Sequence, residues 1–570
     1  MNQYKLIWSL VLGSMITIGL LLALSLSSGS VMASPADPAG EVLAHVDANG
    51  VIRSQDTVST AYVVVRFADD DTIVRAITFT TPISSYRALE LAGLDPVGAN
   101  TAFGLMLCSI DGIGKVLPDG TDCDNGTRYW GTSYWSDSAW EGYLTSSENT
   151  VISQDGHIDG FSWSDPNWVA VDPPPAPPVT SAFNGLDWLR AQQRADGDFG
   201  SPGSTAEAIM AAAANRIDVT TWRHSPSALA NMLSSGASLA NGGSDPAAGA
   251  GKLAVALAAG DGCWPIGAMK PMDYYDPATG AFGANPGSQA WAMMGTAALS
   301  QTVPASATQY LKTAQKADGG WEWITGGGTD TNGTALAIQA LVATGEPVTS
   351  SAIVSGLNYL ESAQNEDGGF PYSPTSPWGT DSDTNSTAYV VQALLAAGED
   401  PLTSTWSVVD SNPIKFLRGM QLSDGSFEWQ KGFGTSQIAT QQAVLALLFR
   451  PLPVKVADLH PCYGIAGRVA DGSVTGSGLM NQGTGDPILN VTVWAQGAGD
   501  LYYGTTISPT GSYTISVPAA SNYELTPDKS GYVFSPTVRT VTVGGAPGTI
   551  HMVKDFVGRT VIYLPLVMRN

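Results

Sequence analysis

The sequence predicts a multidomain protein in which a central helical region stands between two regions of β-strands. Segments rich in Ala and Leu with helical spacing fill residues 181–455. Residues 41–172 and 461–556 instead alternate apolar and polar residues in short runs, separated by turns rich in Gly and Asp. A chain of 570 residues is also too long for one ordinary hydrophobic core, which favours several domains.

The charge balance limits the partners that the protein can bind. Acidic residues outnumber basic ones by 50 to 26, which gives a net charge of -24. Nucleic acids and anionic membrane surfaces bind clusters of Lys and Arg, so we expect neither as a partner. Only 13% of the residues are charged while 64 are Gly, a composition typical of a secreted protein.

The N-terminus predicts export from the cytoplasm. Lys5 precedes an apolar stretch over residues 6–26, and small residues then lead to a V-x-A cleavage site at residues 31–33. This order predicts a signal peptide over residues 1–33. An uncleaved membrane anchor is the alternative, because about 20 apolar residues can span a bilayer. Either way we expect a secreted or cell-surface protein.

The region of residues 41–172 contains strand-like runs such as TAYVVVRF and two of the four cysteines. Cys108 and Cys123 stand fifteen positions apart around the turn DGIGKVLPDGTD, which predicts a disulfide in an oxidising compartment. Cys263 and Cys462 remain, and the sequence leaves open whether they pair. A proline-rich linker follows at residues 173–180, where we expect a semi-rigid polyproline spacer.

The helical region is built from repeats. TDTNGTALAIQALVATG at 329–345 and SDTNSTAYVVQALLAAG at 382–398 share ten of seventeen positions. A second motif, an aromatic residue and Leu followed by Gln and Asp-Gly, occurs at 188–197, 310–319, 359–368 and 416–425, with a degenerate copy at 260–264. A spacing of roughly 50 to 65 residues is typical of a repeat architecture.

Each part of the repeat has a predicted structural role. Gly after the first helix permits a left-handed turn, and the Gln side chain can bond free backbone groups at the helix end. The aromatic residue of the turn fills the junction between neighbouring repeats. Asp330 and Asp383 precede the second helices, where a carboxylate accepts hydrogen bonds from free N–H groups and meets the helix dipole favourably.

The combined pattern of Q-x-x-D-G turns and paired helices resembles the α/α toroid of terpenoid cyclases, protein prenyltransferases and cobalamin carriers. The resemblance covers residues 181–455 and implies an (α/α)6 toroid, with the N-terminal ends of the inner helices around one mouth. One helix pair must be degenerate, and we expect it near residues 226–258. The expected fold is therefore an N-terminal small β domain, a central all-α (α/α)6 toroid and a C-terminal β-sandwich.

The chemistry of the resembled enzymes does not transfer to this sequence. The acid motif of squalene-type cyclases, D-x-D-D-T-A, aligns here with 383–388, so Asn385 replaces the proton donor and Asn332 replaces it in the other copy. An amide cannot protonate a carbon–carbon double bond. The zinc of prenyltransferases needs Asp, Cys and His, and no His follows Asp261 and Cys263 before His460.

A calcium loop is the alternative role for residues 381–385, which carry oxygen ligands at alternate positions. Ser386 stands where such a loop needs Gly, and Gln392 stands where it needs Glu. We therefore expect helix capping and no metal at this loop.

Ligand binding without a reaction is the function that these exclusions leave. Aromatic residues gather in the loops that should face one mouth, close to the Asp and Asn residues of the helix starts. Simple packing is the alternative role for the aromatic residues. The candidate ligand-binding residues are Trp264, Tyr274, Tyr275, Trp323, Asp330, Asn332, Tyr372, Trp378, Asp383 and Asn385.

The strand-rich part at 125–163 resembles the small β domain of transcobalamin and intrinsic factor. The matching residues are Tyr129-Trp130, Tyr134-Trp135, Trp140 and the final GFSW at 160–163. In those carriers cobalamin lies between the β domain and the toroid, so the resemblance implies a corrinoid as a possible ligand. The two modules stand here in the reverse order. For His157 we expect a solvated side chain in a Gly-Asp turn and no role as a cobalt ligand.

The region at 461–556 resembles the carboxypeptidase regulatory-like, transthyretin-type sandwich in the phrases GIAGRV, DPILNVTVWA and GSYTISVPA. Such modules imply a spacer or an adhesive stalk. Residues 557–570 form a short apolar tail with a possible role in surface retention.

The leading hypothesis is an exported, non-catalytic binding protein for a small molecule, with cell-envelope components as possible further partners. An extracytoplasmic cyclase-type enzyme and a surface structural or adhesive protein are the alternatives, and a toroid centre filled by side chains would favour the last.

Overall fold

The structure is a computed structural model that describes residues 59–68, 71–101, 104–126, 128–136, 139–154, 156–164, 176–377, 379–454, 458–472, 485–507 and 509–560. The expected signal peptide at 1–33 lies outside the described residues. So do Trp378, residues 165–175 and the last ten residues of the expected tail. None of the helices in the described part combines the length and apolar character needed to cross a bilayer.

The N-terminal strands form two sheets, because their alternating residues place one apolar face inward. The five-stranded sheet has the order β2-β1-β8-β6-β7, and the three-stranded sheet the order β3-β4-β5. One helix, α2 (Ser85–Leu91), accompanies them. A disulfide joins Cys108 to Cys123, whose Cα atoms are 5.1 Å apart. The strands are β1 (Ser59–Ala68), β2 (Asp71–Phe79), β3 (Val97–Thr101), β4 (Gly104–Ile110), β5 (Ile113–Gly114), β6 (Trp130–Trp135), β7 (Trp140–Gly142) and β8 (His157–Trp163).

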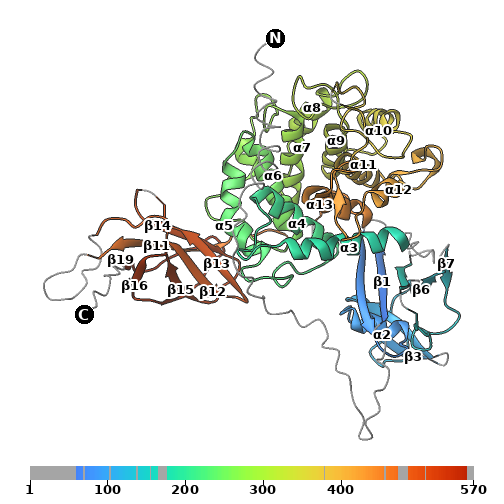
Figure 1. Ribbon diagram of the computed structural model, residues 1–570, viewed down its shortest axis with the longest axis horizontal. Coiled ribbons are helices and arrows are strands. Elements are labelled where there is room, and N and C mark those ends of the chain that lie inside the picture. The colour runs from blue at the N-terminus through green and yellow to red at the C-terminus, as the bar shows by residue number, and fades with distance from the viewer. Residues whose placement is uncertain are drawn as a thin grey trace, which may run out of the picture. The chain divides into compact units, whose positions relative to one another are not determined.

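Within the described residues, six helices of the central region form a closed inner ring (Figure 1). Each inner helix packs on the next, and α13 returns to pack on α4. Five outer helices pack on this ring. The inner helices are α4 (Pro202–Ala214), α6 (Pro246–Ala259), α7 (Pro286–Ala298), α9 (Thr331–Ala343), α11 (Thr384–Ala396) and α13 (Gln437–Leu447). The outer helices are α3 (Ala176–Gln192), α5 (Ala228–Asn241), α8 (Ala305–Thr313), α10 (Ser351–Ala363) and α12 (Pro413–Gly419).

The repeated motif has the structural roles that its residues predict. Asp330 caps α9 by accepting a hydrogen bond from the Gly333 N–H at 2.6 Å. The turn glycine Gly319 has φ +91°, which a side chain would disfavour. Gln315 donates to the carbonyl of Gly319 at 2.7 Å and to that of Ala352, in the neighbouring repeat, at 2.8 Å. The motif thus both closes its own turn and joins successive repeats.

Two predicted boundaries of the helical region are wrong. Residues 226–258, where we expect the degenerate pair, contain the full helices α5 and α6, and the incomplete outer element is instead the 3-10 turn Pro271–Tyr274 before α7. Pro and Gly between residues 265 and 286 prevent a regular helix there. Helix α3 also begins at Ala176, inside the predicted linker at 173–180, because prolines fit the first turn of a helix.

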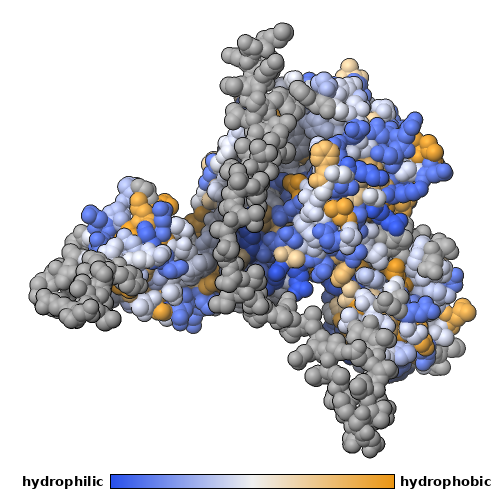
Figure 2. Space-filling view, viewed as in Figure 1, coloured by the Kyte–Doolittle hydropathy of each residue, from blue (hydrophilic) through white to orange (hydrophobic). Residues whose placement is uncertain are grey.

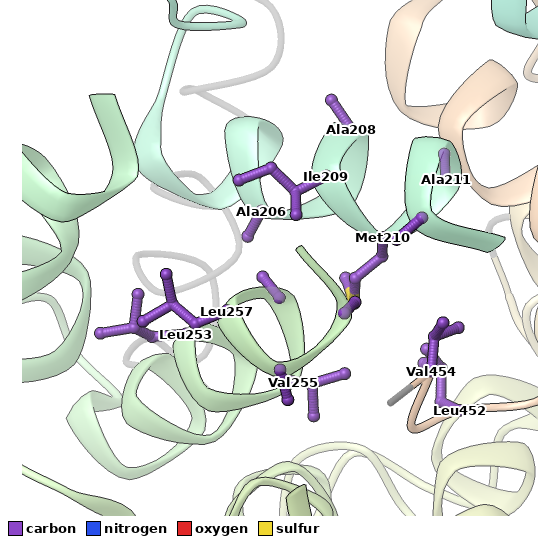
Figure 3. Packing of buried hydrophobic residues seen from close by; sticks show 14 of the residues in the cluster. Ala206, Ala208, Ile209, Met210, Ala211, Leu253, Val255, Leu257, Leu452 and Val454 are labelled. Carbon is purple, nitrogen blue, oxygen red and sulfur yellow. The ribbon is translucent and has the colours of Figure 1, made fainter. Parts of the chain in front are cut away.

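Apolar side chains fill the centre of the ring. The middle residues of α4 and α9 are buried on every face of the helix, and so are residues 253–259 of α6. Figure 3 shows Met210 of α4 directed toward the space between Val255 of α6 and the pair Leu452 and Val454. These last two residues follow α13, and the N–H of Leu452 donates to Oε1 of Gln339 in α9 at 2.9 Å. The segment after α13 therefore closes the ring at the C-terminal ends of the inner helices.

The C-terminal strands form two further sheets. One has the order β14-β11-β19-β16, with β18 beside β11, and the other has the order β13-β12-β15-β17. The last strand pairs with β11 and β16, so this region extends at least to Thr560, beyond the predicted residue 556. A second disulfide joins Cys263 to Cys462. The strands are β11 (Tyr463–Asp471), β12 (Thr492–Gly497), β13 (Asp500–Thr505), β14 (Ser512–Val517), β15 (Asn522–Asp528), β16 (Tyr532–Ser535), β17 (Arg539–Thr542), β18 (Ile550–Met552) and β19 (Phe556–Thr560).

Candidate functional site

Polar side chains from four inner helices meet inside the ring, near the N-terminal ends of those helices. Each lies within the first seven residues of its helix, so all of them are at a similar height in the ring. We call this set the mouth network. It consists of Glu207 of α4, Lys252 of α6, Asn385 and Tyr389 of α11, and Gln442 of α13.

The mouth network is hydrogen bonded from one side of the ring to the other. Nζ of Lys252 lies 2.7 Å from Oε1 of Glu207, and Nε2 of Gln442 lies 3.5 Å from the same oxygen. Gln442 also donates to the hydroxyl of Tyr389 at 3.1 Å and accepts from Nδ2 of Asn385 at 2.6 Å. Burial, with the nearby Glu207 carboxylate, raises the pKa of Tyr389 well above its usual value, so its phenol stays neutral.

Aromatic rings border the mouth network. The Lys252 ammonium lies 4.9 Å from the ring centroid of Trp291, a cation–π distance. The Trp323 ring lies 6.4 Å from that of Tyr389. Glu207 is only 3% exposed, whereas the Lys252 side chain is 20% exposed, so solvent reaches the network from the side of the lysine. The arrangement offers amide, hydroxyl and ammonium groups beside apolar rings, with its one carboxylate ion-paired.

The two capping aspartates are deeply buried and face their own helix starts. Asp330 accepts from the N–H of Gly333 and from that of Trp323, both at 2.6 Å. Asp383 accepts from the N–H of Ser386 at 2.7 Å. Burial raises the pKa of Asp330 to about 7 and that of Asp383 to about 6, although backbone hydrogen bonds act in the opposite direction. Their oxygens are therefore engaged by the protein itself.

The other candidate ligand-binding residues fall into two groups. Trp323, Asn332 and Tyr372 lie with Asn385 around the mouth, where Asn332 is the second residue of α9 and Tyr372 is 39% exposed. Trp264, Tyr274 and Tyr275 lie elsewhere and make packing contacts. The Trp264 backbone pairs with His460 and Cys462, the Tyr274 hydroxyl donates to the Ala240 carbonyl, and Tyr275 packs against Phe282.

The prediction of a solvated His157 is wrong, because the strand β8 holds this residue in a cluster of side chains. Its Nε2 lies 3.1 Å from the Tyr143 hydroxyl, and its ring stacks on Tyr134. The Tyr143 hydroxyl also donates to the fully buried Asp159 carboxylate at 2.5 Å. The histidine therefore belongs to a packed polar cluster.

A hollow of about 630 Å³ lies at the opposite, C-terminal ends of α4 and α6. Strand residues line it together with helix-end residues, and its charges are largely paired with one another. Arg216 lies 2.5 Å from Asp71 and 3.2 Å from Asp111, and Arg450 lies 3.1 Å from Asp71.

Four members of the mouth network were missed by sequence reasoning, and two of them had a signal. Glu207 is the single charged residue in STAEAIMAAAA, and Lys252 is the single charged residue in AAGAGKLAVALAA. A charge in the middle of an otherwise apolar, buried helix requires a partner. Tyr389 and Gln442 have no such signal, because their sequence contexts match those of packing residues.

Residues 261–439 match the family described as Squalene-hopene cyclase C-terminal domain, which places squalene-cyclase-like repeats in the helical part of the chain. No curated protein matches the sequence. Among solved structures, the type II terpene cyclase MstE from Scytonema is 14% identical with a TM-score of 0.35, over 48% of this chain and 98% of that chain. The ent-copalyl diphosphate synthase from Streptomyces platensis is 17% identical with a TM-score of 0.29, over 44% and 49% of the two chains. A structure titled "Glycosidase Wild Type" is 13% identical with a TM-score of 0.32, over 48% and 98%.

Proposed function

We propose that this protein is exported and that the mouth of its helical ring binds a small-molecule ligand without transforming it. The proposal rests on the residue type and the hydrogen bonding of Asn385. This residue stands where squalene-type cyclases have their proton-donating acid, and its amide donates to Oε1 of Gln442 at 2.6 Å within the mouth network. An amide at this position can hold a ligand by hydrogen bonds but cannot start a cyclisation by protonating an alkene.

The carboxylate of the mouth network does not replace the missing acid. A carboxyl group must be protonated to act as a general acid. Glu207 lies 2.7 Å from the Lys252 ammonium and within reach of the Gln442 amide. Both contacts engage Oε1 of this carboxylate within the protein, so Glu207 serves to position Lys252 and Gln442.

A surface structural or adhesive protein is the second candidate function. The filled centre of the ring favours it, because a ring built only as a spacer needs no cavity. The buried hydrogen-bonded network at the mouth favours binding instead, since a purely structural core is more simply made from apolar residues.

Titration of the purified full-length chain with cobalamin and with squalene tests the proposal. Equilibrium dialysis measures the retained ligand, and gas chromatography detects cyclised products. The test pair is Asn385→Leu at the mouth and Gln309→Leu on the exposed face of the outer helix α8, which remove one amide each. We expect retention of a ligand by the wild type and by Gln309→Leu, and weaker retention by Asn385→Leu. Cyclised squalene would instead support an enzyme. Retention of neither compound, together with no binding of the glycans tested in the next subsection, would support the structural role.

A further inference from the structure

Three consecutive repeats carry a pair of aromatic residues two positions apart in the turn before an inner helix. The first residue of each pair is completely buried and fills the junction between repeats. The second is at least partly exposed: Tyr372 is 39% exposed, Trp429 is 42% exposed, and Trp323 is half-buried. The pairs are Trp321 with Trp323, Phe370 with Tyr372, and Phe427 with Trp429. We call the second residues, Trp323, Tyr372 and Trp429, the aromatic arc.

Backbone hydrogen bonds place the aromatic arc on three neighbouring inner helices. The Trp323 carbonyl accepts from the Gly287 N–H of α7, the Tyr372 carbonyl from the Thr331 N–H of α9, and the Trp429 carbonyl from the Thr384 N–H of α11. The three residues therefore lie above the first turns of α7, α9 and α11, which follow one another in the ring. Neighbouring packed helices are about 8–10 Å apart, so the arc repeats an aromatic ring at about this interval.

The protein holds the aromatic arc in place before any ligand arrives. The side chains of Tyr372 and Trp429 lie close to the buried capping carboxylates of Asp330 and Asp383, where they oppose the rise in the pKa of these carboxyl groups that burial causes. The loop after Trp429 is fixed by the buried Glu428, which accepts from the Gly432 N–H at 2.6 Å. A binding surface that is already ordered loses less conformational entropy when it binds.

The loop after Trp323 is fixed in the same way. The buried Glu322 accepts from the N–H groups of Gly326 at 3.0 Å and Gly328 at 3.1 Å, and it pairs with Lys316 at 2.9 Å. The carboxylates next to the arc are thus engaged by the protein, and the arc residues themselves are neutral. The half-buried amides of Asn332 and Asn385 lie at the starts of α9 and α11, beside the arc.

The arc therefore combines neutral aromatic faces with amides, and this chemistry selects its ligand. A hydrocarbon chain would cover the amides without satisfying their hydrogen bonds. A polyanion would be repelled by a chain of net charge -24. Sugar rings have an apolar C–H face and an edge of hydroxyl groups, which fits both features. Figure 2 shows hydrophobic patches interrupting a hydrophilic surface on the side of the helical part that carries α10 to α12.

We propose that the aromatic arc binds a neutral glycan chain, whose sugar rings stack on Trp323, Tyr372 and Trp429 while their hydroxyl groups bond the amides of the mouth. This inference rests on the proposed function and names its ligand class. The exposed ring of Phe433, which is 70% exposed and 5.3 Å from the ring of Trp429, extends the same surface outward.

Isothermal titration of the full-length chain with cellohexaose, chitohexaose and maltohexaose tests this proposal. We expect one of the three to bind, and Tyr372→Ala and Trp429→Ala each to weaken that binding about tenfold. Trp429→Phe removes the indole N–H but keeps an aromatic face, so it should retain most of the affinity. Trp135→Ala, which removes a half-buried tryptophan from β6, is the matched control and should bind as the wild type does.

Two outcomes would overturn the inference. The first is that none of the three hexasaccharides binds, and the second is that Trp429→Phe weakens binding as much as Trp429→Ala. If the protein retains cobalamin in the dialysis experiment but binds no glycan, the proposal of a glycan ligand is wrong and the proposed binding role stands. If the protein binds neither cobalamin nor a glycan, both the glycan ligand and the proposed binding function are wrong.

Discussion

Replacing Lys252 with Met would leave the buried Glu207 carboxylate without its counter-ion. The two charges are 2.7 Å apart, and the side chains are 20% and 3% exposed. At an effective dielectric constant of about 20, their attraction is about 6 kcal/mol, and desolvation of both ions offsets much of it. Removing one partner of such a pair costs about 3 to 5 kcal/mol, and we expect about 3 because solvent reaches the lysine. Glu207→Gln should cost less, since the lysine left behind can turn toward solvent.

Thermal and urea unfolding of the full-length chain measure these effects, and the double variant Glu207→Gln/Lys252→Met isolates the coupling. We expect the double variant to be more stable than Lys252→Met alone, because no unpaired buried charge remains. Lys312→Met is the matched control: its partner Glu346 is also 2.7 Å away, but the side chains are 31% and 13% exposed, so the loss should be about 1 kcal/mol. Additive losses in the double variant, or equal losses for the two lysines, would refute the reasoning.

Two further predictions concern the helix starts and the helix contacts. Burial raises the folded-state pKa of Asp330 to about 7, above the unfolded value of 3.8. The contribution of the protonated Asp330 to the free energy of unfolding is therefore fully present below about pH 4 and is lost as the pH rises through 7. Asp330→Asn should remove this slope from thermal midpoints measured between pH 4 and pH 8, and an unchanged slope would contradict the assignment. Gly251→Ala should destabilise the protein by about 3 kcal/mol in urea unfolding, because a Cβ would lie 2.2 Å from the Trp291 carbonyl oxygen. Gly419→Ala, with no atom within 4 Å of its Cβ, should be neutral or stabilising by about 0.5 kcal/mol, and equal losses at both glycines would disprove the close contact.

The parts of the fold that local chemistry determines could be predicted from the sequence. Asp330 and Asp383 cap their helices because a carboxylate before a helix has one strongly favoured role. The turn glycines likewise follow from the backbone geometry after a helix. The degenerate pair was misplaced, because the repeat motif is nearly absent from both 226–258 and 265–286. The Pro and Gly residues of the second segment are the local signal that distinguishes the two.

The candidate site could be predicted only in part, because its residues meet through the ring and not through the sequence. Asn385 could be predicted as a site residue because residues 383–388 align with the acid motif of squalene-type cyclases. Its partner Gln442 lies 57 positions away on another helix, and no motif marks it. Trp264 was assigned to the mouth by its position in a turn, yet its backbone pairs with His460 and Cys462, almost 200 positions later. No local pattern reports such a long-range contact.

The filled ring and the exposed arc together favour a ligand that lies across the mouth over one that is enclosed. A cyclisation needs its reactive intermediate shielded from water, which requires an enclosed cavity. In this chain Met210, Val255 and Leu452 occupy the centre of the ring, and the hydrogen-bonded side chains of Glu207 and Gln442 lie across the level above them. A ligand held there keeps one side in solvent, as an extended chain of sugar units would. The same packing therefore provides a rigid floor for binding.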